Sequence, residues 1–308
     1  MSGFEPDYTG LDYTGDDMAD CPRPLPVLLP PAPDEAFSSW VTRHAKFVGI
    51  GPTAMLRHCA PGVPSLGELD RQLRPARDMR LCRLFRIDQA TLQSMRFTDL
   101  DSDVEHRLVA KQVDHQCARC ARALRLAGFE GAAPRAWFHV WRITCSQCGA
   151  QVEPPLTVRP TSKAAIPDLY PELWEEALEG QALIADAIRT GGPGMPVPPM
   201  RLLRLITMII GDQPMAQRKA DRLTLDAVIP GFNAVVDRYR FKFPMALVQL
   251  PLALRSALLA GYAGAVADPE RAIRAMWPMV CGHHRAHFRF LLTDFPNGRW
   301  LWPWISKQ

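Results

Sequence analysis

The sequence lacks the patterns that mark export and membrane insertion. No amino-terminal segment combines a basic start with an apolar stretch, so no signal peptide is predicted. The longest apolar run, residues 246–267, is broken by Gln249, Pro251 and Arg255, which argues against a lipid-facing span of about 20 residues. We therefore expect a cytoplasmic protein that has no membrane partner, in which this run is a buried helix.

Motifs for nucleotide binding and for hydrolysis are absent as well. The chain contains no G-x-x-x-x-G-K-[ST] loop, no G-x-G-x-x-G after a strand, no H-E-x-x-H and no G-x-S-x-G. The acids Asp99, Asp101 and Asp103 are interpreted as a polar loop beside a helix, not as a nuclease centre. The sequence therefore predicts no catalytic residues and a protein that is not an enzyme.

The composition is that of a folded chain with short helices. Of 308 residues, 47% are hydrophobic and 22% are charged, which excludes wholesale disorder, collagen-like repeats and a disulfide scaffold. The 29 prolines interrupt helices and exclude a long coiled coil.

Charge is distributed unevenly along the chain. The first twenty residues hold six acids and no base, so the remaining residues carry 36 Lys and Arg against 26 Asp and Glu, a net charge of +10. A basic body of this kind suits a nucleic acid or an acidic protein as partner, although solubility alone explains it equally well.

The amino-terminal part divides into a tail and a helical region. Residues 1–33 carry a twofold Asp-Tyr-Thr-Gly repeat and then six prolines, and we predict that they are disordered. Asp34 is expected to cap a first helix, and the apolar spacing beyond it predicts a helical bundle over residues 34–110 that could hold a helix-turn-helix.

The rest of the chain reads as a small metal ribbon followed by helices. The predicted fold class is mainly α with a zinc-ribbon insert, in which residues 138–143 favour β structure. The expected parts are a zinc ribbon at 111–158, a helical connection at 159–190, a Pro/Gly linker at 191–200, and a helical carboxyl-terminal domain at 201–308 with helices near 201–211, 214–223, 231–240, 245–267 and 269–277.

Two Cys-x2-Cys pairs give the strongest chemical signal. Each pair forms a tight turn that directs both thiolates to one side, and two such turns complete a tetrahedral shell for one Zn²⁺. The alternatives are buried free cysteines or a redox pair, and His115 could compete as a ligand. A glycine after the last cysteine suits the left-handed turn of such a knuckle. The predicted ligands of this structural zinc are Cys117, Cys120, Cys145 and Cys148.

Other residues could bind a second metal or a nucleic acid. Cys281, His283 and His287 have ligand-type spacing, although a core-packed or solvated histidine cluster is the commoner arrangement. A row of arginines at three-residue steps suits phosphate contacts, with a solvated charged face as the alternative. The candidates in this row are Arg74, Arg77, Arg80 and Arg83.

Three segments, taken in order, resemble the TniQ family. Residues 23–26 and 33–43 are similar to the opening of TniQ proteins, in which a proline-rich lead precedes an acidic residue, a Ser-Trp pair and a first helix. Residues 81–97 resemble the helix pair of that family, and residues 117–148 resemble its zinc ribbon. The last metal position is often His in the family and is Cys148 here.

The resemblance implies a non-catalytic adaptor of a Tn7-like or Tn5053-like transposon. Such an adaptor connects a DNA target, or a CRISPR Cascade complex bound to DNA, to an AAA+ ATPase regulator (TnsC/TniB-like) and through it to the transposase. Arg43 and Lys46, near Trp40, are candidates for the ATPase contact. One alternative function is a stand-alone zinc-ribbon transcription regulator that binds DNA by itself. The other is an enzyme whose site lies in the region from Cys281 to His287.

Overall fold

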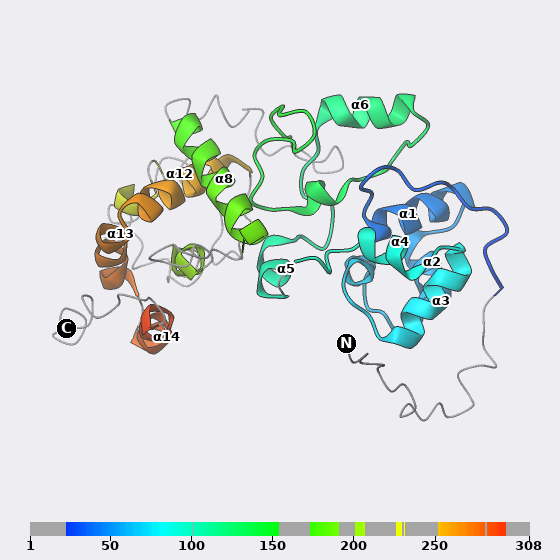
Figure 1. Cartoon of the computed structure of the whole chain (residues 1–308), viewed down its shortest axis with the longest axis horizontal. Coiled ribbons are helices and arrows are strands. Elements are labelled where there is room, and N and C mark those ends of the chain that lie inside the picture. Colours follow the sequence, from blue (N-terminus) through cyan, green and yellow to red (C-terminus); the bar gives the residue numbers. More distant parts are fainter. Residues whose placement is uncertain are drawn as a thin grey trace, which may run out of the picture.

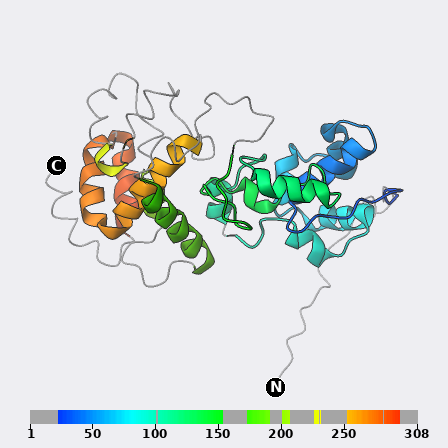
Figure 2. The ribbon, with the colours of Figure 1, turned by 90° about the horizontal axis from the view of Figure 1, so that it is seen from above.

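The protein is a mainly helical molecule in three parts that follow one another in space. The computed structural model describes residues 23–100, 102–153, 173–190, 201–206, 226–229, 231, 252–280 and 282–293. An amino-terminal helical bundle lies at one end, carboxyl-terminal helices lie at the other, and the cysteine-containing segment lies between them (Figures 1 and 2). No helix within these ranges has both the length and the apolarity that crossing a bilayer requires.

The amino-terminal bundle confirms the predicted helical region. Its elements are α1 (Phe37–Phe47), α2 (Pro52–Cys59), the 3₁₀ helix η1 (Leu66–Asp70), α3 (Pro75–Phe85) and α4 (Gln89–Ser94). Proline is the first residue of both α2 and α3, where its missing N–H costs nothing. At the centre of the core, Phe37 packs edge to face against Trp40 and Phe85, and the rings of Trp40 and Phe85 are tilted against each other.

Capping of these helices is partly local and partly tertiary. The Asp88 side chain accepts from the backbone N–H of Thr91 at 2.6 Å and caps α4, as its sequence position indicates. The expectation that Asp34 caps α1 was wrong, because the cap position is Ala36, which has no capping side chain. Asp70, far along the chain, instead accepts from the backbone N–H of Ser38 at 2.7 Å.

The prediction of a disordered tail through residue 33 was also wrong for its last part. Residues 23–33 run along the bundle, where Leu25 is buried and its N–H donates to the carbonyl of Leu84 at 3.0 Å. The indole N–H of Trp40 donates to the Leu29 carbonyl at 2.9 Å. We call residues 23–33 the strap. Side chains of α1 hydrogen-bond to its backbone and so hold it in place although it buries little apolar surface. Residues 1–22 lie outside the described ranges.

A buried ion pair fastens the strap to α1. The guanidinium of Arg43 contacts the Glu35 carboxylate at 2.7 Å and also donates to the carbonyl of Pro30 at 2.8 Å. The Glu35 carboxylate accepts further from the hydroxyl of Ser39 and from the N–H of Ala32, both at 2.9 Å. Arg43 is therefore buried in the fold, and its assignment as a partner contact was wrong.

The middle segment forms few regular elements. It contains α5 (Ser102–Leu108), α6 (Ala118–Leu126) and the 3₁₀ helix η2 (Arg135–Phe138). The β-favouring residues 138–143 form no strand in the described chain, although His139 takes part in an isolated bridge with Val109. The aromatic side chains there are used for packing, since Trp137, Phe138 and Trp141 are buried.

The carboxyl-terminal part is helical, as the sequence predicts. Its named elements are α8 (Trp174–Thr190), α12 (Leu252–Ala267), α13 (Pro269–Met276), the 3₁₀ helix η5 (Trp277–Met279) and α14 (Gly282–Thr293). Residues 201–206 are helical as well. The expected linker at 191–200 and the expected helices at 214–223 and 231–240 lie outside the described residues, apart from residue 231.

Helix α8, which the sequence predicts as part of a helical connection, packs against the carboxyl-terminal helices. It packs along α12 so closely that a Cβ built on Gly180 would lie 2.0 Å from the carbonyl oxygen of Leu259. The absence of a side chain at Gly180 therefore allows the backbones to approach.

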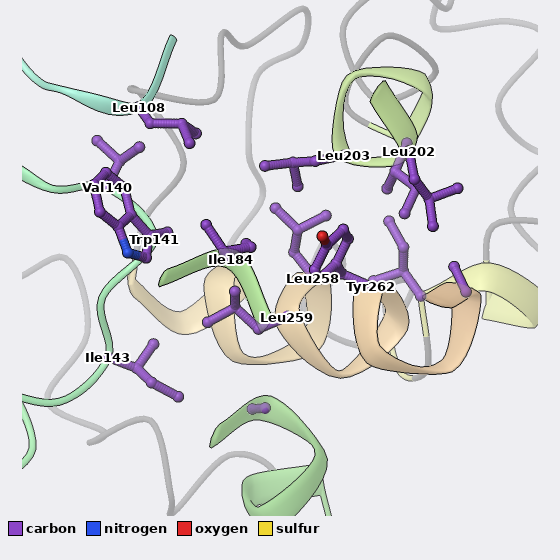
Figure 3. Packing of buried hydrophobic residues seen from close by; sticks show 14 of the residues in the cluster. Leu108, Val140, Trp141, Ile143, Ile184, Leu202, Leu203, Leu258, Leu259 and Tyr262 are labelled. Carbon is purple, nitrogen blue, oxygen red and sulfur yellow. The ribbon is translucent and has the colours of Figure 1, made fainter. Parts of the chain in front are cut away.

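A shared core joins the middle segment to the carboxyl-terminal helices. Figure 3 shows Val140, Trp141 and Ile143 facing the side of α12 that carries Leu258 and Leu259. The contact between these two parts, which we call the joint, is also polar. The side-chain oxygen of Gln181 on α8 accepts from the backbone N–H groups of residues 143 and 144. The middle segment is thus packed as one unit with the helices that follow it.

Removal of the Arg43 side chain tests its structural role. In Arg43→Ala the carboxylate of Glu35 stays buried without its cation, so we expect unfolding in urea to show a loss of about 3–5 kcal/mol. The matched control is Lys46→Ala on the exposed side of the same helix, which should change stability by less than about 0.5 kcal/mol. Equal effects of the two substitutions would contradict the assignment.

Candidate metal centre

The first cysteine pair is held by the start of α6. Cys117 occupies the cap position of this helix and Cys120 lies in its first turn. The backbone N–H of Ala121 donates to the Cys117 carbonyl at 2.8 Å, which closes the turn. Positions three apart share one helix face, so both sulfur atoms are presented on the same side.

The second pair lies in a tight turn that has no helix. The N–H of Gly149 donates to the Cys145 carbonyl at 3.0 Å, and the N–H of Cys145 donates to the Ala150 carbonyl at 2.7 Å. Gly149 has φ of 70°, a conformation that side chains disfavour. The left-handed glycine predicted from the sequence is therefore confirmed.

Backbone bridges hold the two turns together. Gln116 and Glu153 exchange two N–H to carbonyl hydrogen bonds, each 2.7 Å long, and the N–H of Val152 donates to the Ile143 carbonyl at 3.1 Å. These bridges place the residue before the first pair beside the chain that leaves the second pair.

The four sulfur atoms converge at one point. All lie within 4.8 Å of one another, with 3.5 Å between Cys117 and Cys148 and 3.6 Å between Cys120 and Cys145. These separations exceed the disulfide length of about 2.05 Å. They are close to the edge of a tetrahedron with metal–sulfur bonds of about 2.3 Å, which is about 3.8 Å. The cluster therefore fits a tetrahedral cation.

The environment shifts the pKa values of the thiols in opposite directions. Burial raises the pKa of Cys120 and of Cys117, so these thiols resist ionisation by themselves. A hydrogen bond from the backbone of Ala150, together with the Cys117 thiol, lowers the pKa of the more exposed Cys148 to about 7. Metal binding deprotonates a coordinating thiol outright, so a bound cation would hold all four cysteines as thiolates.

His115 lies outside the sulfur cluster. Its ring is buried, and Nδ1 lies 3.1 Å from the Asp114 carboxylate. Asp114 in turn accepts from the guanidinium of Arg255 on α12 at 2.7 Å. Burial lowers the pKa of His115, which agrees with a neutral imidazole. His115 therefore contributes to the joint with α12, and the cluster consists of four thiols.

The second predicted metal set is described only in part. The side chains of Cys281 and His283 lie outside the described residues. Nε2 of His287 lies 3.1 Å from the guanidinium of Arg204, which only donates, so this nitrogen acts as an acceptor.

The predicted arginine row is partly used inside the bundle. Arg80 donates to the carbonyls of Cys59 at 3.1 Å and His58 at 3.0 Å, so it satisfies the end of α2. Arg77 is half-buried, whereas Arg74 and Arg83 are exposed. Exposed Lys46 lies at the end of α1. The sequence reading missed a second row of arginines on α6, which the same three-residue spacing could have revealed.

The comparison with protein families matches the bundle and the cysteine segment. The sequence model of the TniQ family, described as TniQ, matches residues 26–153. Over these residues the chain is similar to the TniQ family. No curated protein and no solved structure matches the chain.

The TniQ match has bounds that agree with the structure. It begins within the strap at residue 26 and ends at residue 153, whose backbone pairs with Gln116 beside the first cysteine turn. The TniQ segment thus includes the ordered strap, the bundle and all four cysteines, whereas the carboxyl-terminal helices lie beyond it.

Metal analysis tests the cysteine centre directly. We expect one tetrahedrally bound ion per chain in the purified protein, and we expect Cys120→Ser to lose the ion and the ordered middle segment, because binding and folding are coupled in such sites. The control is Cys82→Ser, which changes a cysteine of α3 far from the cluster in sequence. A metal-free wild-type protein with freely titratable thiols would refute the centre.

Proposed function

We propose that this protein is a non-catalytic adaptor that selects targets for a Tn7-like transposon. The adaptor would link a DNA target, or a Cascade complex bound to DNA, to an AAA+ ATPase regulator that admits the transposase. The observation that carries this proposal is the TniQ match over residues 26–153, which includes both the bundle and the metal centre.

The chemistry of the cluster supports an adaptor over an enzyme. We infer that the bound ion is Zn²⁺, because four thiolates in a tetrahedron are the donor set of structural zinc sites. Four protein ligands leave no coordination position for water or substrate. The ion would therefore hold the middle segment together, and this segment in turn joins the bundle to the carboxyl-terminal helices.

Exposed apolar side chains at the turn between α1 and α2 support a protein partner for the bundle. Phe47, Val48 and Ile50 expose 55%, 45% and 42% of their surface, although all three are apolar. The turn is held by Gly49, which has φ of 74°. Consecutive exposed apolar side chains of this kind mark protein contacts. We assign this turn, together with Lys46, to contact with the ATPase regulator.

Co-purification with the ATPase regulator encoded nearest to this protein tests the assignment. With DNA and nucleotide present, we expect wild type to form a complex and the double variant Phe47→Asp/Val48→Asp to lose at least tenfold in affinity. A matched control is Met79→Asp on α3, which changes an equally exposed apolar residue and should bind normally.

The same experiment separates the adaptor from the stand-alone regulator. The four-sulfur centre and the basic body fit both functions. A protein that forms no complex with the ATPase under any condition, yet binds one DNA sequence tightly by itself, would be the transcription regulator and would overturn the adaptor.

A further inference from the structure

Helix α6 presents a basic outer face beside the metal centre. Arg119, Arg122 and Arg125 recur at three-residue steps, about 4.5 Å of helix rise, and all three are exposed. The inner face is different, because Cys120 is buried and Leu124 packs against the core. The helix thus has one side committed to the fold and one side that carries charge.

Three other basic residues of the middle segment already have partners. Lys111 pairs with Glu68 at 2.8 Å, Arg135 pairs with Asp34 at 3.1 Å and Asp99 at 3.0 Å, and Arg142 donates to His139 at 3.5 Å. In the part of the chain that the structure describes, the three arginines of α6 have no ion pair or side-chain hydrogen bond. Their charge is therefore available to a ligand.

Among the described residues, no acid pairs with the arginines of α6. The sequence has no acid between Asp114 and Glu130, so no acid lies on the helix itself. Figure 1 shows α6 along an outer edge of the molecule, and in Figure 2 it faces the viewer. Leu126, at the end of the helix, is 79% exposed, which shows that no described residue covers this end.

We propose that the outer face of α6 binds the phosphate backbone of double-stranded DNA. Arginine suits this ligand because its planar fork of donors matches phosphate oxygens bidentately. The row of three spans about 9 Å along the helix, and one DNA strand advances about 3.4 Å per phosphate, so neighbouring side chains can reach separate phosphates. Contacts of this kind carry affinity without reading sequence.

The metal centre gives this surface its rigidity. Cys117 and Cys120 lie at the cap and in the first turn of α6, so an ion held by them fixes the end at which the arginine row begins. The surface deepens the proposed function and rests on it for the choice of DNA as the polyanion. An acidic polypeptide is the competing ligand, and the experiment includes it.

The test compares two full-length variants that lose the same charge. One is Arg119→Gln/Arg122→Gln/Arg125→Gln on α6. The control is Arg23→Gln/Arg57→Gln/Arg86→Gln on the strap and the bundle, which changes three arginines that are also exposed and also without a partner among the described residues. Fluorescence anisotropy measures the affinity of each protein for a 30-base-pair duplex of random sequence from 50 to 200 mM salt.

We expect the α6 variant to bind at least tenfold more weakly at 100 mM salt. Its plot of log K against log salt should be flatter than wild type by about 2.7, which is about 0.9 for each lost phosphate contact. The control should keep the wild-type slope to within about 0.5. Metal content and melting temperature should be the same in all three proteins.

Several outcomes would overturn the proposal. Equal weakening in both variants would show an effect of net charge alone, and loss of metal or of thermal stability in the α6 variant would show a structural role for the row. Binding of poly-glutamate with the affinity of DNA and the same dependence on α6 would make the ligand an acidic polypeptide. Co-purification with the ATPase is measured separately, so failure here leaves the adaptor function standing.

Discussion

Convergence of four thiols on one point is the constraint on which the middle of this protein depends. The described part of this segment has isolated bridges and short helical turns, so no sheet ladder holds its chain in place. Two of the bridging hydrogen bonds lie beside the cysteines, and the aromatic side chains around them are buried. A tetrahedral ion would supply the cross-link that a segment with so little regular structure needs.

The cysteine segment lies between the two helical parts, so this constraint affects both of them. The cysteine segment contacts the bundle on one side, where the Ala133 N–H donates to the Ser39 hydroxyl at 2.8 Å. On the other side, Asp114 accepts from Arg255 of α12 and the two parts share one apolar core. Loss of the cross-link would therefore loosen the connection between both helical ends.

Buried polar pairs play the comparable role inside the bundle. Glu35 and Arg43 fasten the strap to α1, and Arg96 pairs with Asp78 of α3 at 2.8 Å. Each carboxylate has its cation and further donors or acceptors nearby, and the cost of burying the charges is offset only while the pair is intact. Single substitutions in such pairs are therefore more damaging than their replacement as a pair.

The sequence by itself determined the features that depend on local spacing, and the tertiary structure decided those that depend on distant partners. The cysteine steps, the left-handed Gly149, the Asp88 cap and the helical periodicity of α13 are readable because all the atoms involved lie within a few residues. The neighbouring sequence does not indicate that Asp70 accepts a hydrogen bond from the start of α1 or that Arg43 is buried. Both depend on contacts that form only when the chain folds. The arginine rows of α3 and α6 have the same spacing, and only the packed structure shows which side chains are engaged: Arg80 meets the carbonyls at the end of α2, whereas the α6 row meets solvent.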